Sequence, residues 1–224
     1  MIGALSSATP ILDWEWIRGH WDDIGGRVVE HLALTGIALG VGLAVSLALA
    51  GAILRFPGMR GPITWSAGAL YTIPSLALFA FLVPMTGFGI LTAEIGLVSY
   101  TLLILTRNIL AGIEGVDPAV REAAEGMGYG PQRLFWRVEL PLALPVVIAG
   151  IRVAAVTTIG LVTVTALIGQ GGLGFFILRG LSRSFETEII VGTALSVVLA
   201  TGVDLLLLGA ERLATPWARR GRPA

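Results

Sequence analysis

One stretch, from Val116 to Pro145, holds the densest set of residues that could do polar chemistry. It reads VDPAVREAAEGMGYGPQRLFWRVELPLALP and places four carboxylates and three guanidinium groups between long apolar runs. Such groups form ion pairs and charge-assisted hydrogen bonds, which suit the docking of a partner. The whole chain has no cysteine and two histidines, His20 and His31. Disulfides, zinc–thiolate sites, Cys nucleophiles and a histidine-based metal cluster are therefore excluded.

The order of residues in this stretch predicts two helices separated by a bend. Asp117 and Pro118 suit the N-cap and the first helical position. Residues 119–127 favour helix, with acidic side chains in the early turns. Gly128 and Gly130 then allow a tight bend, and Pro131 opens a second helix over residues 132–139. The sequence predicts a helix–turn–helix along a membrane surface. It is either a docking surface for a cytoplasmic partner or a loop whose arginines meet anionic lipid.

The composition places the rest of the chain in a bilayer. Of the 224 residues, 55% are hydrophobic and only 13% are charged, with a mean hydropathy of +0.84. A soluble protein of this composition would expose large apolar patches, whereas a bilayer solvates them. The net charge is zero, which argues against a nucleic-acid partner.

The apolar runs predict an all-α, polytopic membrane protein with five transmembrane helices. A spanning helix needs about 20 apolar residues. Five segments qualify, and all are rich in the small residues that let membrane helices pack closely. They are His31–Leu54, Ile63–Pro84, Gly89–Leu110, Leu142–Ile168 and Ile189–Gly209.

The arginines set the expected orientation, because positive residues concentrate on the cytoplasmic side. With five spans, ten arginines fall on the side of the 111–141 loop and four on the other side. The N-terminus is therefore expected outside and the C-terminal tail inside. The expected division is an external segment over residues 1–30, a membrane domain over 31–213 and a cytoplasmic arginine-rich tail over 214–224.

Two segments outside the spans have an open interpretation. Residues 11–30 mix Trp14, Trp16 and Trp21 with acidic side chains, which predicts either an interfacial helix or a frayed polar tail. Residues 169–188, GQGGLGFFILRGLSRSFETE, are too short in their apolar part to cross a bilayer. They predict either a re-entrant or an interfacial element.

A few residues within the spans carry functional hypotheses. Arg152 and Asp204 either pair across the last two spans, or Arg152 reaches the inner interface alone. Pro74 either kinks a helix that lines a pathway or serves packing. Glu94 is either an interfacial carboxylate or a contact for a binding protein.

The spacing in the 111–141 loop resembles the EAA loop of ATP-binding-cassette (ABC) importer permeases. That motif is Glu-Ala-Ala, three residues, Gly, nine residues, an aliphatic residue, one residue and Leu-Pro. The chain has Glu122, Ala123, Ala124, Gly128, Val138, Leu140 and Pro141 at these positions. Within the family the chain looks closest to permeases for glycine betaine, choline, carnitine and related osmoprotectants. The segments Glu30–Leu32, Thr72–Ala77, Arg107–Asn108 and Ile168–Gly174 carry that likeness.

The resemblance implies a permease fold of the type I ABC importer class and a set of partners. These are two cytoplasmic ATPase subunits that bind ATP and Mg, a second permease subunit and an external solute-binding protein. The permease itself binds no cofactor and is not an enzyme. Glu122, Ala123, Ala124 and Gly128 would couple it to the ATPase, with Val138, Leu140 and Pro141 completing the motif. Tyr71, Pro74, Ser75, Gln170 and Gly172 are expected at the pathway or its gate.

Three other functions stay open from the sequence. The chain could be an ABC permease for methionine, phosphonate or another amino-acid-like solute. A stand-alone secondary transporter would need buried acid or histidine relays or an inverted repeat, which two intramembrane charges support poorly. A membrane enzyme ranks last, because no Ser/His or Asp/Asp pair lies at matching depth.

Overall fold

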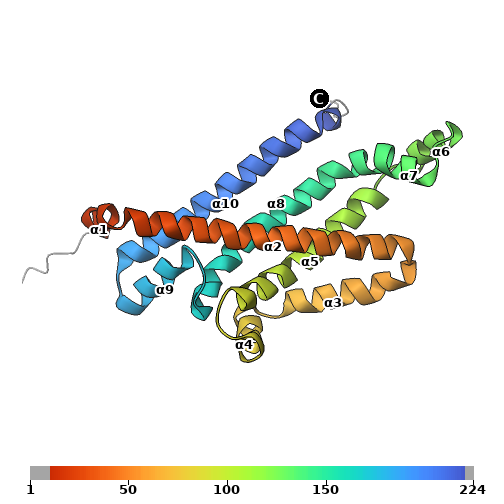
Figure 1. Ribbon diagram of the computed structural model, residues 1–224. Coiled ribbons are helices and arrows are strands. Elements are labelled where there is room, and N and C mark those ends of the chain that lie inside the picture. The colour runs from red at the N-terminus through yellow and green to blue at the C-terminus, as the bar shows by residue number, and fades with distance from the viewer. Residues whose placement is uncertain (1–10, 220–224) are drawn as a thin grey trace, which may run out of the picture.

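A computed structural model describes residues 11–219, and every regular element in that part of the chain is helical (Figure 1). The longest helices are α2 (Trp21–Arg55), α5 (Ile90–Glu114), α8 (Leu140–Val164) and α10 (Glu186–Ala214). Shorter ones are α1 (Trp14–Gly19), α3 (Arg60–Thr72), α4 (Ser75–Thr86), α6 (Pro118–Gly126), α7 (Pro131–Leu134) and α9 (Gly174–Arg183).

Four stretches of helix are long and apolar enough to cross a membrane, and a fifth span results if α3 and α4 count as one. This agrees with the predicted all-α, five-span architecture. The structure differs at the second span, where the prediction of a single helix over Ile63–Pro84 is wrong. The two helices there meet at an angle of 99°. The cause lies at Ile73, because the residue before a proline is driven to extended backbone; Ile73 has φ −66° and ψ 127°.

Helix α2 runs across the predicted boundary after residue 30 without a break. Asp13 caps α1 by accepting from the backbone N–H of Trp16 at 2.9 Å, and α1 ends at Gly19. From Trp21 a single helix of 35 residues then runs on to Arg55. At 1.5 Å per residue, α2 is about 52 Å long, so it crosses the hydrocarbon core and extends well beyond it.

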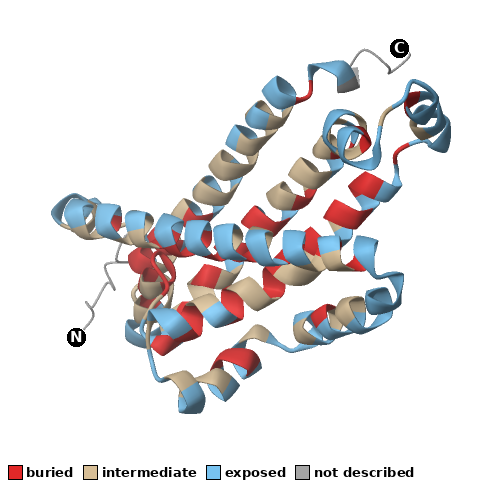
Figure 2. Ribbon diagram, turned by 45° about the vertical axis from the view of Figure 1, so that its right-hand side comes forward, coloured by how far each residue is buried: buried red, intermediate tan, exposed pale blue. Residues whose placement is uncertain are grey.

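Helices α2, α5 and α8 form the centre of the bundle, and Figure 2 shows buried residues gathered there. One apolar cluster joins α2 and α5 to Phe79 of α4 and Val162 of α8. Small residues allow the close approach. A Cβ at Gly42 would lie 1.9 Å from Oγ1 of Thr101, and one at Gly150 would lie 2.3 Å from Cβ of Asn108.

The chain enters α8 without a break. Residues 131–134 form α7, residues 135–139 form a π-helical segment, and α8 follows directly. Pro141 has no N–H to donate to the carbonyl four residues earlier, and the turn before it is widened. The second helix of the predicted helix–turn–helix is thus the start of the fourth span.

The two ends of the bundle hold different elements (Figure 1). We call the end with α1, α9 and the start of α10 the α9 end. The other end, with the α2–α3 turn, α6, α7 and the last turns of α10, is the α6 end. The predicted arginine-rich loops belong to the α6 end. Of the predicted tail over 214–224, Arg220 and Arg222 lie outside the described residues.

Candidate functional site

The bend at Gly128 is a helix-terminating motif built from backbone hydrogen bonds. Asp117 caps the start of α6 by accepting from the N–H of Ala119 at 2.8 Å. At the other end Gly128 has φ +83°, and its N–H donates to the carbonyl of Glu125 at 2.8 Å. The N–H of Tyr129 donates to the carbonyl of Ala124 at 3.1 Å. This pair of bonds is a Schellman motif, which requires a left-handed residue and so favours glycine.

The residues of the EAA pattern divide between the surface and the interior of this loop. Glu122 and Ala123 are exposed, whereas Ala124 is only 2% exposed. Val138, Leu140 and Pro141 are half-buried. Glu122 and Ala123 are therefore placed to meet a partner, and Ala124 is placed to pack the loop. A Cβ at Gly128 would meet nothing within 4 Å, so backbone conformation alone accounts for glycine there.

The loop is braced by charged residues outside the motif. The guanidinium of Arg121 lies 2.8 Å from a carboxylate oxygen of Glu139 and donates to the carbonyl of Ile113 at 2.6 Å. Arg121 thus ties α6 to the end of α5 and to the π-helical segment. Arg60, at the start of α3, forms an ion pair with Glu114 at the end of α5. Neither pair was foreseen from the sequence, since each joins elements that meet only in the folded bundle.

An apolar foot anchors the same loop in the bundle. Leu134 is 8% exposed, and Phe135 packs on a cluster contributed by α2, α5 and α8. The cluster consists of Ala50, Ile53, Ile109, Leu110, Ile113 and Ala143. Movement of this loop would therefore be transmitted directly to three spanning helices.

The structure brings Arg152 and Asp204 together. Nε and Nη2 of Arg152 donate to the two carboxylate oxygens of Asp204 at 2.9 and 3.0 Å. Nη1 also donates to Glu211 at 3.2 Å, a partner that the sequence did not indicate. Glu211 lies seven residues after Asp204, which is two helical turns along the same face of α10. A cleft of about 430 Å³ beside this pair is lined by α8 and by Asp204.

Tyr71, Pro74 and Ser75 gather at the break between α3 and α4. Residues 71–74 are all exposed in the chain, and Ser75 is half-buried. The ring of Tyr71 lies edge-on to the ring of Tyr100 on α5, with centroids 5.9 Å apart. The hydroxyl of Tyr100 donates to the carbonyl of Ile73 within the break. Tyr100 was missed in the sequence because it is separated from the break by 27 residues.

Gln170 and Gly172 lie at the α9 end, in the turn before α9. Gln170 donates to the carbonyl of Gly169 at 3.1 Å and is partly exposed. Gly172 has φ +48°, and a Cβ there would lie 2.6 Å from Cβ of His31 and 2.8 Å from the carbonyl oxygen of Arg27. The turn therefore packs tightly against α2.

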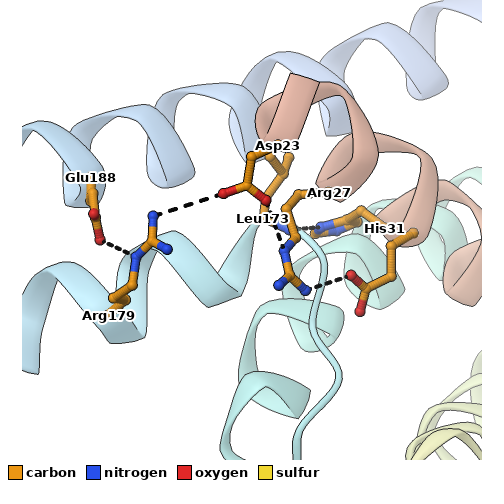
Figure 3. Close-up of polar contacts among 7 residues, drawn as sticks. Asp23, Arg27, His31, Leu173, Arg179 and Glu188 are labelled. Carbon is orange, nitrogen blue, oxygen red and sulfur yellow. Dashed lines mark hydrogen bonds and ion pairs between the residues drawn. The ribbon is translucent and has the colours of Figure 1, made fainter. Parts of the chain in front are cut away.

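His31 completes that contact as a buried polar bridge. It is fully buried, and its Nε2 lies 3.0 Å from the carbonyl oxygen of Ile159 on α8. The N–H of Leu173 donates to its Nδ1 at 3.3 Å (Figure 3). These partners fit a neutral ring that carries its proton on Nε2.

A network of charges and rings surrounds the bridge. Arg179 on α9 lies 2.7 Å from Glu188 on α10 and 3.9 Å from Asp23 on α2 (Figure 3). Arg27 pairs with Glu30 at 2.8 Å, and its guanidinium lies 3.9 Å from the ring centroid of Phe175. Three helices are thus joined at the α9 end, where the sequence predicted only a re-entrant or interfacial element.

Glu94 lies in the first turns of α5, and both carboxylate oxygens are buried with no hydrogen-bond partner among the described residues. Its role as an interfacial carboxylate or as a contact for a binding protein stays a prediction.

The family described as "Binding-protein-dependent transport system inner membrane component" matches residues 36–219. The osmoprotectant import permease protein OsmW of Salmonella typhimurium is 37% identical over 193 residues, 84% of this chain and 89% of that one. The choline transport system permease protein OpuBB of Bacillus subtilis is 38% identical over 191 residues, covering 85% and 88%.

Among solved structures, an amino acid ABC transporter "with histidines" is similar in fold. The TM-score is 0.77 at 17% identity, and the match covers 90% of this chain and 98% of that one.

Proposed function

Because the chain belongs to the family of binding-protein-dependent transport system inner membrane components, a family of ABC import permeases, we propose that the exposed surface of α6 couples it to an ATPase. As a permease subunit it is a multi-pass protein of the inner membrane and has no ATPase site of its own. ATPase and binding-protein partners follow from the family.

One observation carries the coupling proposal: the sequence motif coincides with a rigid, projecting helix. Glu122 and Ala123 are exposed on α6, while Ala124, Arg121 and Gly128 hold the helix in place from within. An exposed carboxylate can accept charge-assisted hydrogen bonds from a partner, and alanine permits close approach. The foot at Leu134 and Phe135 would pass a movement of α6 to the spans as rigid-body motion.

The proposed substrates are osmoprotectants with a quaternary ammonium group, such as glycine betaine, choline or carnitine. The names of two relatives above, an osmoprotectant permease and a choline permease, support this class. Each of these matches covers most of this chain and most of the relative, which further supports the same substrate class. The solved amino acid transporter shares the fold at an identity too low to favour its substrate.

The proposed orientation places the α6 end in the cytoplasm and the α9 end outside. The excess of arginines on the loops of the α6 end supports it. The pathway would run between this chain and a second permease subunit, either a second copy or a related chain.

The test compares two glycines of the same loop in the complete importer. Gly128→Val places a β-branched residue at φ +83°, where the strain should disrupt the Schellman motif. Gly130→Val is the matched control, since Gly130 has φ −73° and ψ 165° and meets nothing within 4 Å. We expect Gly128→Val to reach the membrane, yet to lose at least about tenfold of the binding-protein-stimulated ATPase activity. Gly130→Val should keep most of it.

Normal stimulated ATPase activity in Gly128→Val would overturn the coupling assignment. If both variants lost activity and both still bound the ATPase subunits, the loop would be needed for coupling, but the Schellman motif at Gly128 would not be the cause.

A further inference from the structure

The break between α3 and α4 lies deep in the membrane. Thr72 is the thirteenth residue of α3, so it lies about 20 Å along that helix from the α6 end. Tyr100 lies 14 residues before the end of α5, which is about 21 Å from the same end. Two helices thus place the break independently within a hydrocarbon core about 30 Å thick.

The break exposes irregular backbone at that depth. Residues 71–74 are exposed in the chain. Within the described residues no hydrogen bond is made to the carbonyl of Tyr71 or of Thr72. Non-helical backbone does not face lipid, because lipid cannot satisfy its polar groups, and it occurs where it is covered by protein or lines a watery cavity. This face of the permease therefore belongs to the transport path or to the boundary with the second permease beside that path.

Two aromatic rings form a corner at this break. Tyr71 is 38% exposed and Tyr100 only 6%, and their rings meet at 67°. The hydroxyl of Tyr100 is bonded to the carbonyl of Ile73, which fixes one ring. The hydroxyl of Tyr71 has no hydrogen-bond partner within the described residues. The carbonyl end of α3, which carries a partial negative charge, lies beside both rings.

We propose that Tyr71, held from behind by the buried ring of Tyr100, forms a subsite on the transport path that takes the quaternary ammonium group of the substrate. Aromatic faces bind such cations, which cannot donate hydrogen bonds. Free carbonyls of the helix end add attraction without a full charge that would hold the cation too firmly for release. The inference rests on the proposed function for its substrate class. It adds the place where the cation binds, the α3–α4 break, and a role for Tyr100 there.

The first experiment measures binding to the purified permease–ATPase complex without its binding protein. Radiolabelled choline and glycine betaine are the probes. Tyr71→Leu should weaken binding of both by about 3- to 30-fold, the range of a cation–π contact. Tyr71→Phe keeps the ring and should bind within about twofold of wild type. Unlabelled 3,3-dimethylbutan-1-ol, the uncharged isostere of choline, should compete poorly with labelled choline for binding to the wild-type complex.

A second pair of variants separates the ring of Tyr100 from its hydroxyl. Tyr100→Phe removes the bond to Ile73 and should weaken binding less than Tyr100→Leu, which also removes the ring. The control is Trp65→Leu, since Trp65 is an aromatic residue of α3 that is 76% exposed and lies away from the break. It should leave binding unchanged. Co-purification of the ATPase subunits confirms that each variant assembles.

The second experiment is ATP-driven uptake into proteoliposomes with the binding protein present. If wild type takes up no quaternary ammonium compound, the proposed function fails. If wild type takes them up while Tyr71→Leu matches it in both binding and uptake, the aromatic subsite is overturned and the function stands. Equal weakening by Tyr71→Phe and Tyr71→Leu would assign the effect to the hydroxyl and would also overturn the proposal.

Discussion

The two ends of the bundle are held together in different ways. At the α9 end the contacts join residues far apart in the chain. The N–H of Asp13 donates to Thr187 at 2.9 Å, and His31 accepts from Leu173, 142 residues away. At the α6 end the ties of the loop are shorter in sequence, as in the 18-residue separation of Arg121 and Glu139. The C-terminal half of α10 has no buried residue there, and its residues are exposed or half-buried (Figure 2).

The difference indicates which parts can move independently. At the α9 end α1, α2, α9 and α10 share one apolar cluster with Ile24, Leu173, Phe176 and Val191 at its centre. Opening any one of these helices would break several contacts at once. At the α6 end the loop is stiff within itself and attached through one apolar foot. A stiff segment on a limited attachment suits a part that a partner displaces, whereas the α9 end suits a fixed reference.

The largest effect is expected at the α9 end, from Gly172→Ala. The added Cβ would lie 2.6 Å from Cβ of His31, at φ +48°. The overlap and the backbone strain together should cost about 2–4 kcal/mol of stability. The measurement is the thermal midpoint of the detergent-solubilised protein by size-exclusion chromatography.

Gly26→Ala is the matched control for that measurement. Gly26 lies in α2 close to the same turn, and a Cβ there meets nothing within 4 Å. Because alanine favours helix over glycine, the control should keep or slightly raise stability. If Gly172→Ala kept wild-type stability but lost transport, Gly172 would act in a gate, and the α9 end would not be the fixed reference.

The sequence predicted the α6 end well because its structure is local. Asp117, Pro118 and Gly128 act within one or two helical turns of themselves, and the structure places a cap, a helix start and a left-handed bend at these residues. Four of the five membrane spans were also predictable as single helices, since apolar length alone defines them. The family pattern in the same loop agrees with the matched family.

The α9 end and the α3–α4 break were not predictable in the same way. The network around Arg179 depends on which helices pack side by side, and no local pattern indicates that Asp23 and Glu188 share one arginine. Pro74 indicated a kink or packing, but a proline within a membrane helix allows a mild bend as readily as a 99° break. The tie from Tyr100 to Ile73 arises only once the break exists.

An intermediate effect is expected where α10 meets α8 between the two ends. Arg152→Asp should lower the thermal midpoint, because it sets a third carboxylate beside Asp204 and Glu211. The double variant Arg152→Asp with Asp204→Arg restores one ion pair and should recover at least half of the loss. Since the side chains of Arg152 and Asp204 are 23% and 33% exposed, solvent weakens the pair and full recovery is not expected. Absence of any rescue would show that the pair does not tie α10 to α8.

The smallest effect on stability is expected at the α6 end, from Arg121→Ala. The side chain of Arg121 is 31% exposed and braces the loop through Glu139, whereas the apolar foot is held by the packing of Leu134 and Phe135. Loss of a partly exposed ion pair should cost only about 1 kcal/mol of stability. The loosened α6 should nevertheless reduce binding-protein-stimulated ATPase activity several-fold. Arg133→Ala is the control, since Arg133 stacks on Tyr129 at 4.3 Å and does not join α6 to another helix. A thermal midpoint as low as that of Gly172→Ala would show that the brace supports the whole bundle, and the proposed division between a fixed end and a displaced end would be wrong.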